Sequence, residues 1–330
     1  MKRFLCIILS IAMLLTVINL IPPKRIENNP FLAGEDGLPM VTAHRGGGEN
    51  NPENTMLAFR EAVYSYDVDI IESDLWLTKD GYLVYNHDSY IDRTCNVNGD
   101  ISEEELMTLI DKEENRHYIA DMTLAELQIY NFGYYFKDEN GVRIYKDVTD
   151  IEAAGLQIAT AEQLLDEFYL SHPDLLFVVE IKNEGEDGAI ACDKLNAIIN
   201  NYPEYLDNVL IGTFHPEVEE LLAREYPHLM RGASLKGAII FILTHLLGVN
   251  LFDRSDFTCL QIPLSYTVGI EIRLDIQSLI DRAHLRGIAV QYWTVNDEDE
   301  MRRLIEMGVD GITTDNPALL REIINEYKAK

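Results

Sequence analysis

From residue 41 onward the chain alternates short apolar runs with segments of helical periodicity. Many of the runs are rich in β-branched residues, which is typical of buried strands. Eight such runs lie at residues 41–44, 69–77, 175–182, 209–214, 228–235, 259–265, 288–295 and 311–315. Gly287 and Gly308 follow two of the helical segments, at positions typical of helix C-termini. This repeat predicts an α/β fold, a closed (β/α)8 barrel of the TIM type rather than an open doubly wound sheet.

Two segments interrupt the repeat after the second predicted strand. Residues 82–88 form an additional strand-like run, and residues 92–156 form a long insertion with polar helical segments and several tyrosines. Loops that leave the C-termini of barrel strands form the rim of the active site, so we expect the insertion to be a small cap. Its tyrosines are expected to pack within the cap rather than to contact a substrate.

The N-terminus carries a long apolar segment. Lys2 and Arg3 precede residues 4–21, a run that would be about 27 Å long as a helix, close to the thickness of a bilayer core. We interpret residues 1–21 as a transmembrane anchor, with a cleaved signal peptide as the alternative. Residues 22–40 would be an irregular tether. The positive charges predict a catalytic domain, residues 41–330, outside the cytoplasm, or secreted if the segment is cleaved.

The net charge argues against one class of partner. The 330 residues include 56 acidic and 27 basic side chains, which give a net charge of −29. Such a field repels polyanions, so we expect no nucleic acid partner. An anionic substrate would have to be held by a locally positive centre, such as a bound metal.

Charged side chains interrupt two of the predicted barrel strands. Glu72 and Asp74 are two residues apart, so both point to one face of their strand, and Glu180 and Lys182 repeat this spacing. Ionised carboxylates inside a barrel are costly unless they are paired or bind a cation. Three carboxylates suit Mg²⁺ or Ca²⁺, so the sequence predicts a divalent metal site at Glu72, Asp74 and Glu180. A Glu180–Lys182 ion pair without a metal is the alternative.

Two histidines complete this set. His44 ends the first predicted strand and His87 follows the additional strand-like run. Imidazole is well suited to proton transfer near neutral pH, and we interpret the two as an acid/base pair. Arg45 and Lys182 would bind phosphate oxygens, and the glycines at 46–48 would let backbone amides approach an anion. The combination predicts metal-assisted attack at phosphorus.

Several of these segments together resemble the signature of a known family. They are HRGGGENNPENTMLAF (44–59), IESDLWLTKDGYLVYNHD (71–88), IDRT (91–94), VVEIK (178–182), YWTVND (292–297) and GVDGITTDNP (308–317). In this order they resemble the glycerophosphodiester phosphodiesterase family, over roughly residues 41–330 apart from the insertion. Asp67 is a departure, since the family usually has glycine at that turn.

The resemblance implies hydrolysis of small-molecule glycerophosphodiesters to glycerol phosphate and an alcohol. It implies a metal bound by the three carboxylates, acid/base catalysis by the two histidines and phosphate binding by Arg45 and Lys182. It further implies that Phe214 and Trp293 line the substrate pocket, although packing in the barrel core is an alternative for Trp293.

A second apolar segment, residues 236–252, bears on whether the substrate is a soluble diester or a membrane lipid. It is short for a membrane span, yet it lacks the polar face of an outer barrel helix. We interpret it either as a helix buried beneath another element or as one that dips into the membrane beside the active site. The second interpretation favours a lysophospholipase D-type activity on membrane lysolipids. A non-catalytic binding protein on a degenerate barrel is disfavoured, because both histidines and all three carboxylates are present.

Overall fold

The computed structural model describes residues 2–20, 25–249 and 255–329. Within these residues, parallel strands form one sheet in the order β6-β5-β4-β2-β1-β11-β10-β7. A parallel bridge between Gly232 and Cys259 joins its two ends, so the sheet is a nearly closed barrel. The strands are β1 (Met40–Ala43), β2 (Ile70–Leu77), β4 (Leu176–Ile181), β5 (Val209–Gly212), β6 (Met230–Arg231), β7 (Cys259–Ile262), β10 (Ala289–Tyr292) and β11 (Gly311–Thr314). The predicted barrel and its strand positions are confirmed.

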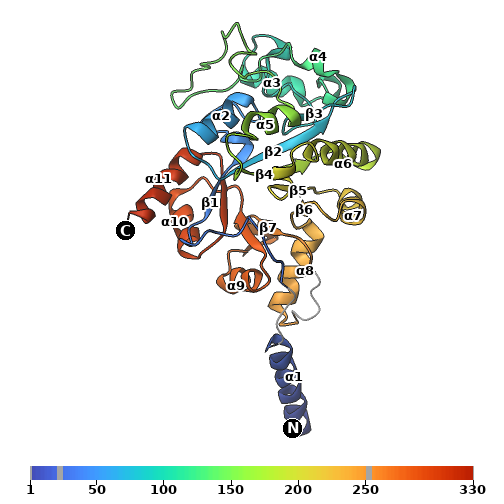
Figure 1. Cartoon of the computed structure of the whole chain (residues 1–330), viewed down its shortest axis with the longest axis vertical. Helices are drawn as coiled ribbons and strands as arrows, with labels where there is room; N and C mark the ends of the chain where they lie inside the picture. The colour runs from blue at the N-terminus through green and yellow to red at the C-terminus, as the bar shows by residue number, and fades with distance from the viewer. Residues whose placement is uncertain (1, 21–24, 250–254, 330) are drawn as a thin grey trace.

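Helices surround this sheet (Figure 1). They are α2 (Met56–Tyr64), α5 (Ala161–Phe168), α6 (Gly185–Ile199), α7 (Pro216–Glu225), α8 (Leu235–Leu246), α9 (Gln277–Leu285), α10 (Glu298–Glu306) and α11 (Pro317–Lys328). Local sequence fixes their ends. The Thr55 hydroxyl accepts a hydrogen bond from the Ala58 amide at the start of α2. Gly287 and Gly308, each with φ +69°, follow α9 and α10 as predicted.

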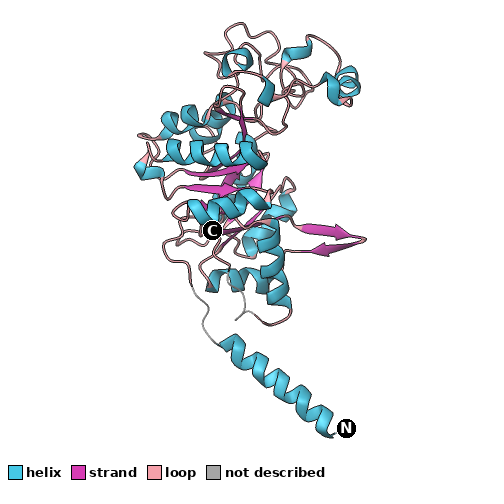
Figure 2. Cartoon of the chain, turned by 90° about the vertical axis from the view of Figure 1, so that its right-hand side faces the viewer, coloured by secondary structure: helices cyan, strands magenta, loops and turns pink. Residues whose placement is uncertain are grey.

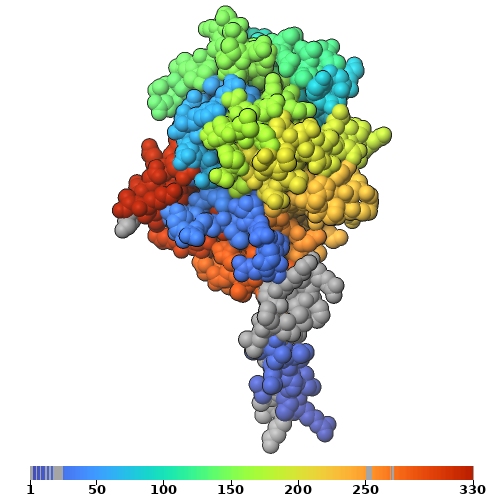
Figure 3. All heavy atoms as spheres, viewed as in Figure 1, coloured from blue at the N-terminus to red at the C-terminus, as the bar shows by residue number. Residues whose placement is uncertain are grey.

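The insertion forms a small subdomain on one side of the barrel, next to α2 and α5 at the top of the view (Figures 1 and 3). The additional strand β3 (Leu83–Tyr85) pairs antiparallel with β2. It is followed by α3 (Glu103–Ile110), α4 (Leu124–Leu127) and the short turns η2 (Asn96–Asn98), η3 (Glu113–Asn115) and η4 (Ile119–Asp121). Ile119, Leu127 and Phe132 are buried in a separate hydrophobic cluster of this region. Its tyrosines pack against aromatic neighbours, as expected: the ring centroids of Tyr134 and Tyr135 are 5.2 Å apart.

The N-terminal apolar segment forms a helix, α1 (Lys2–Leu20), that extends away from the barrel (Figure 2). Of the helices in the described part of the chain, none combines the length and the apolar character that crossing a membrane requires. The transmembrane anchor predicted over residues 1–21 is therefore not confirmed.

The segment interpreted as a tether packs against the barrel. Residues 25–39 contain no helix or strand, as predicted, while residues 22–24 lie outside the described residues. The Asn29 side-chain amide donates hydrogen bonds to the carbonyls of Thr258 and Gly287, at 2.8 and 2.9 Å. Phe31 is fully buried and joins a cluster that includes Ile70 and other first residues of barrel strands. Phe31 thus closes the barrel interior at the N-terminal ends of the strands, and this part of the irregular segment is held against the barrel.

The second apolar segment is only half-buried, so the prediction of a fully buried helix is wrong. On one side of α8 the ring of Phe241 packs on Phe257, with centroids 5.9 Å apart. The opposite side exposes large apolar side chains, including Ile240 (43% exposed) and Leu243 (50% exposed). Residues 250–252 of the segment lie outside the described residues. A hairpin of β8 (Ser265–Val268) and β9 (Ile270–Arg273) follows β7 and projects from the barrel (Figure 2).

Candidate active site

The predicted carboxylates lie at the far end of the barrel interior from Phe31. Alternate residues of a strand share one face, so Glu72 and Asp74 follow the buried Ile70 on the inner face of β2. Glu180 follows Leu176 and Val178 in the same way on β4. Asp74 and Glu180 are direct neighbours in the β2–β4 register. The fold thus places acidic side chains of two adjacent strands at the C-terminal edge of the barrel.

The loop after β1 reaches the same edge through a tight turn. His44–Gly46 form a short 3₁₀ turn in which Arg45 has a φ of 54°. Gly46 and Gly47 also have positive φ, and a Cβ on Gly46 would lie 2.9 Å from the Ala58 side chain. The glycines are therefore required by backbone conformation and packing. The turn directs the Arg45 backbone N–H at Glu72 Oε2, 2.9 Å away.

The two predicted phosphate-binding cations are paired with carboxylates. Lys182 Nζ lies 3.0 Å from Asp74 Oδ1 and 2.8 Å from Glu180 Oε2. Arg45 Nε lies 3.5 Å from Asp74 Oδ2, which also accepts a hydrogen bond from the Asn54 side chain at 3.1 Å. Burial raises the pKa of Asp74, but the charges of Lys182 and Arg45 outweigh it and hold this pKa below its ordinary value. Asp74 is thus an ionised, buried carboxylate at the centre of the site.

Glu72 has less positive charge around it than Asp74 has. Burial and the neighbouring charge of Asp74 raise the pKa of Glu72 to about 7, although His44, with Nε2 3.9 Å from Glu72 Oε2, and the Arg45 amide oppose this shift. Burial likewise raises the pKa of Glu180 despite its contact with Lys182. Buried carboxylates with raised pKa values gain stability from an added cation, and oxygen donors suit Mg²⁺ or Ca²⁺. The side chains present therefore fit a divalent ion.

The carboxylate oxygens of the three predicted metal ligands do not all lie close to one point. Among the described residues, the group whose ligand atoms all lie within 4.8 Å of one another is a different one, formed by Glu184, His215 and Glu217. Two of the predicted carboxylates turn to the Lys182 ammonium, and Glu72 turns to a backbone N–H. A shared ion would require at least one of the three carboxylate side chains to turn. The metal site at these carboxylates stays a prediction.

Each predicted catalytic histidine is held by an aspartate. His44 Nδ1 lies 2.6 Å from Asp315 Oδ1, and His87 Nδ1 lies 2.9 Å from Asp88 Oδ1. Burial lowers the pKa of His44, but the hydrogen bond to Asp315 and the charge of Glu72 outweigh it, so this pKa is raised. If each Nδ1–H is donated to its aspartate, Nε2 is the atom that exchanges a proton with the substrate. It accepts a proton when the ring is neutral and donates one when the ring is charged.

His87 reaches the carboxylates from the strand pair β2–β3. The backbone N–H of Asn86 donates to the Asp74 carbonyl at 3.0 Å, which sets His87 beside the end of β2. The charge of His87 acts to lower the pKa values of Asp74 and Glu180. Both imidazoles therefore lie at the same end of the barrel as the acidic residues.

The aspartates and an arginine network were missed by the sequence analysis. Arg93 donates to Asp88 Oδ2 through Nε at 2.6 Å and to both oxygens of Glu53, at 2.6 and 3.0 Å. Asp315 follows β11 directly, so the rule that strand ends carry function could have found it. Glu53 and Arg93 come from loops within the signature segments 44–59 and 91–94, which could have drawn attention to them.

The two predicted aromatic residues meet at the rim of the barrel. Phe214 follows β5 and Trp293 follows β10, and their ring centroids lie 6.4 Å apart at 72°. Phe214 is 57% exposed and Trp293 is 36% exposed, so core packing of Trp293 is wrong. Their strands are not adjacent in the sheet, so the aromatic pair extends across part of the barrel mouth.

Comparison with known proteins indicates which family this chain resembles. The model of the glycerophosphoryl diester phosphodiesterase family matches residues 44–319. A glycerophosphodiester phosphodiesterase of Caldanaerobacter subterraneus subsp. tengcongensis is 27% identical over 291 residues, covering 87% of this chain and 98% of its own. A human lysophospholipase D is 23% identical, covering 87% of this chain and 86% of its own.

A solved structure shares the fold. The Oleispira antarctica phosphodiesterase in complex with the product sn-glycerol-3-phosphate superposes with a TM-score of 0.62 at 21% identity. The alignment covers 87% of this chain and 97% of that protein.

Proposed function

The chain belongs to the glycerophosphoryl diester phosphodiesterase family and is a phosphoric diester hydrolase, and we propose that it hydrolyses glycerophosphodiesters to glycerol phosphate and an alcohol. One observation carries the proposal: buried carboxylates, two cations and two aspartate-held histidines gather at the C-terminal edge of the barrel. This is the edge at which barrel enzymes place their chemistry. The product-bound relative supports a glycerol phosphate product.

The histidines would move the protons. With Nδ1–H donated to an aspartate, each imidazole presents Nε2 to the substrate. One histidine takes a proton from the attacking oxygen, and the other gives a proton to the leaving alcohol oxygen. The aspartates keep the rings in this tautomer and stabilise the imidazolium form.

The cations would hold the phosphate. Arg45 offers a planar fork of donors and Lys182 a point charge, and both stabilise charge that develops on the phosphoryl oxygens. A divalent cation, Mg²⁺ or Ca²⁺, held by Glu72, Asp74 and Glu180 would polarise a phosphoryl oxygen. Lys182 contacts two of these carboxylates, so its ammonium would turn to the phosphate once they hold the ion.

The attacking oxygen is either water or a neighbouring glycerol hydroxyl of the substrate. Direct attack by water gives glycerol phosphate in one step. Attack by the hydroxyl closes a cyclic phosphate and breaks the bond to the alcohol, which leaves; water then opens the ring to give glycerol phosphate. Detection of a cyclic phosphate product during the reaction would establish the second route.

The test is an activity panel on the full-length protein. Glycerophosphocholine and related diesters are incubated with the protein, and glycerol phosphate release is followed before and after chelation, then with Mg²⁺ or Ca²⁺ restored. We expect hydrolysis that stops on chelation and returns with the ion. Hydrolysis that continues unchanged under strong chelation would refute the proposed metal dependence. No hydrolysis of any diester would refute the proposed substrate class.

The exposed apolar side of α8 favours a second candidate, lysophospholipase D-type hydrolysis of membrane lysolipids. The helix begins at Leu235, just beyond β6, and so starts at the active-site edge. Its exposed side, Ile239, Ile240, Leu243 and Leu246, would lie on a bilayer. The human lysophospholipase D among the relatives is consistent with this activity.

The location of the catalytic domain outside the cytoplasm stays a prediction.

Two comparisons separate the candidates. The first is turnover of glycerophosphocholine against lysophosphatidylcholine. The second is liposome binding of the double variant Ile240→Asp, Leu243→Asp, with Glu219→Gln on α7 as a surface control. Lysolipid hydrolysis requires that the double variant lose liposome binding and lysolipid turnover while it keeps turnover of the soluble diester. Unchanged liposome binding would exclude α8 as the contact.

A further inference from the structure

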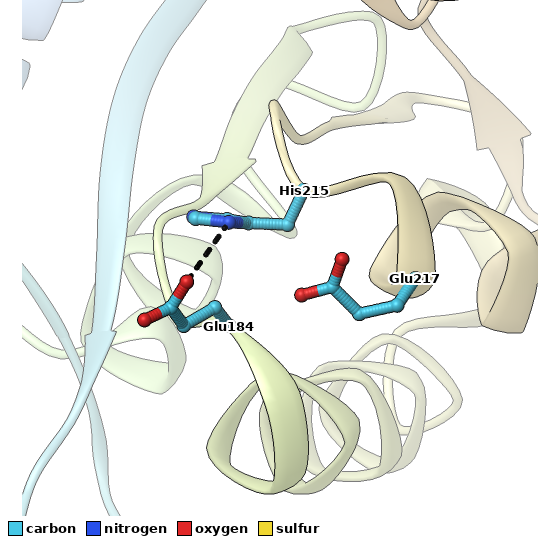
Figure 4. Close-up of side chains that lie close together, drawn as sticks. All are labelled: Glu184, His215 and Glu217. Carbon is cyan, nitrogen blue, oxygen red and sulfur yellow. Dashed lines mark ion pairs between the residues drawn. The ribbon is translucent and has the colours of Figure 1, made fainter.

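A second group of metal-type ligands lies on the rim, apart from the predicted carboxylate site. Glu184 follows β4 and precedes α6, while His215 and Glu217 lie at the start of α7. Figure 4 shows the three side chains turned toward one another from these two loops. Each offers a nitrogen or oxygen atom within 4.8 Å of the others.

The orientation of the imidazole distinguishes this group from an ordinary acidic surface. His215 Nε2 lies 3.0 Å from the backbone carbonyl of Lys182, an acceptor that requires Nε2 to carry a hydrogen. In the neutral ring the Nδ1 lone pair then faces Glu184 Oε2 at 3.7 Å, beyond hydrogen-bonding distance. A histidine that donates one N–H to a backbone carbonyl and presents its other nitrogen to acidic groups has the arrangement of a metal ligand.

Helix ends account for the acidic residues but not for the imidazole. Glu184 is the N-cap of α6 and Glu217 lies in the first turn of α7, where negative charge is favourable. Glu217 Oε1 also accepts a hydrogen bond from the Gly185 amide at 3.3 Å, which orients its carboxylate. These roles do not require the Nδ1 lone pair of His215 to be turned to the Glu184 carboxylate. Without a cation, that arrangement is repulsive.

We propose that Glu184, His215 and Glu217 form a second metal site, which binds a borderline divalent ion of the Zn²⁺ class. One imidazole and two carboxylates suit such an ion better than Mg²⁺ or Ca²⁺, which prefer oxygen ligands alone. Three protein ligands leave a coordination position for water. Glu184 has an 80% exposed side chain, so the ion can enter from solvent.

The site would join two loops that carry active-site residues. Glu184 lies two residues after Lys182, and His215 lies next to Phe214. The ring of His215 already connects the loops through the Lys182 carbonyl. A bound ion would fix the loop after β4 relative to the loop after β5. Its effect would be structural, on the positions of Lys182 and Phe214, rather than on the reacting atoms.

The competing arrangement is a protonated His215 in an ion pair with Glu184. It adds a proton at Nδ1 and needs no metal. The two arrangements differ in a direct measurement, because only the proposed site binds Zn²⁺ through His215.

The experiment is a Zn²⁺ titration of the full-length, chelator-treated protein by calorimetry. Excess Mg²⁺ is present to occupy the oxygen-only site. We expect the wild type to bind one more equivalent of Zn²⁺ than His215→Asn, and Glu184→Gln and Glu217→Gln to bind that ion at least about tenfold more weakly. His228→Asn, a matched change at an exposed histidine between α7 and β6, at the other end of the barrel, should bind as the wild type does. Added Zn²⁺ should raise the thermal midpoint of the wild type but not of His215→Asn.

One variant keeps this proposal separate from the proposed function. Asp74→Asn should lose hydrolysis but retain the His215-dependent Zn²⁺ equivalent. Equal Zn²⁺ stoichiometry and affinity in the wild type, His215→Asn and Glu217→Gln would overturn the second site and leave the ion pair as its explanation. If His215→Asn unfolds, the two glutamine variants decide the outcome alone.

Discussion

Replacing Asp315 with asparagine is expected to slow hydrolysis by forcing His44 into the wrong tautomer. Asn296 determines how the new amide would lie. Its Oδ1 accepts hydrogen bonds from the Thr314 hydroxyl and the Asp315 backbone N–H, at 3.0 and 2.9 Å, so its Nδ2 must donate to Asp315 Oδ2, 2.7 Å away. In Asp315→Asn the side-chain oxygen therefore stays with Asn296, and the NH₂ group faces His44 Nδ1.

The size of the effect follows from this exchange of donor and acceptor. Nδ1–H would meet an N–H group at the 2.6 Å contact, so the active tautomer loses a hydrogen bond to a charged group and leaves a donor unsatisfied. These losses together are about 3–4 kcal/mol for partly exposed groups. At about 1.4 kcal/mol for each factor of ten, kcat should fall roughly 10²–10³-fold.

The assay is glycerol phosphate release at saturating glycerophosphocholine. Asp299→Asn, an exposed change in the first turn of α10, is the matched control and should keep wild-type kcat. The thermal midpoint of each variant separates lost chemistry from lost folding. A folded Asp315→Asn protein with kcat within about threefold of the wild type would refute the tautomer argument.

Three further changes test other parts of the structure. Glu72→Gln removes one predicted metal ligand and should reduce hydrolysis at least about 100-fold, with a higher metal concentration needed for half-activation; wild-type metal dependence would contradict that role. The hydrogen bond to Asp310 raises the pKa of His284, so its contribution to stability is complete below about pH 6.5 and is lost as pH rises through the folded pKa. The wild type should therefore exceed His284→Gln in unfolding free energy more at about pH 5.5 than at about pH 8.5, and an equal difference would exclude this linkage. Phe59 is fully buried with its ring 5.4 Å from Tyr85, so Phe59→Ala should cost about 3–5 kcal/mol in denaturant unfolding, and a cost below about 1 kcal/mol would contradict this packing.

The elements that sequence predicted best are those set by local periodicity. The barrel strands were identified because their apolar runs are short, β-branched and separated by helical spacing. Because alternate residues of a strand share a face, the sequence placed Glu72 and Asp74 on the same side of their strand. In the structure, the β2–β4 register makes Glu180 the neighbour of Asp74. Parallel strands end at the same edge, so residues 108 positions apart could be assigned to one site from the pattern alone.

The parts that sequence could not predict depend on which loops touch. Residues 25–39 contain no periodic pattern, and only the structure shows Phe31 inside the barrel. For Trp293 the sequence allows both the core and the pocket, because an aromatic residue after a strand fits either until its exposure is known. Loop contacts are set by the three-dimensional path of the chain rather than by spacing.

The arrangement of partners is consistent with the proposal that the two histidines act as a pair, although their loops differ. His44 follows a parallel barrel strand, and its aspartate is the residue directly after β11, the neighbour of β1. His87 follows an antiparallel strand outside the parallel barrel and takes its aspartate from the next residue, which Arg93 holds in place. In both cases Nδ1 contacts an aspartate, so the two Nε2 atoms would be available at the same edge for the opposite proton transfers that we propose. The proposed acid/base chemistry would thus depend on equivalent hydrogen bonding at two sites that the fold builds in unrelated ways.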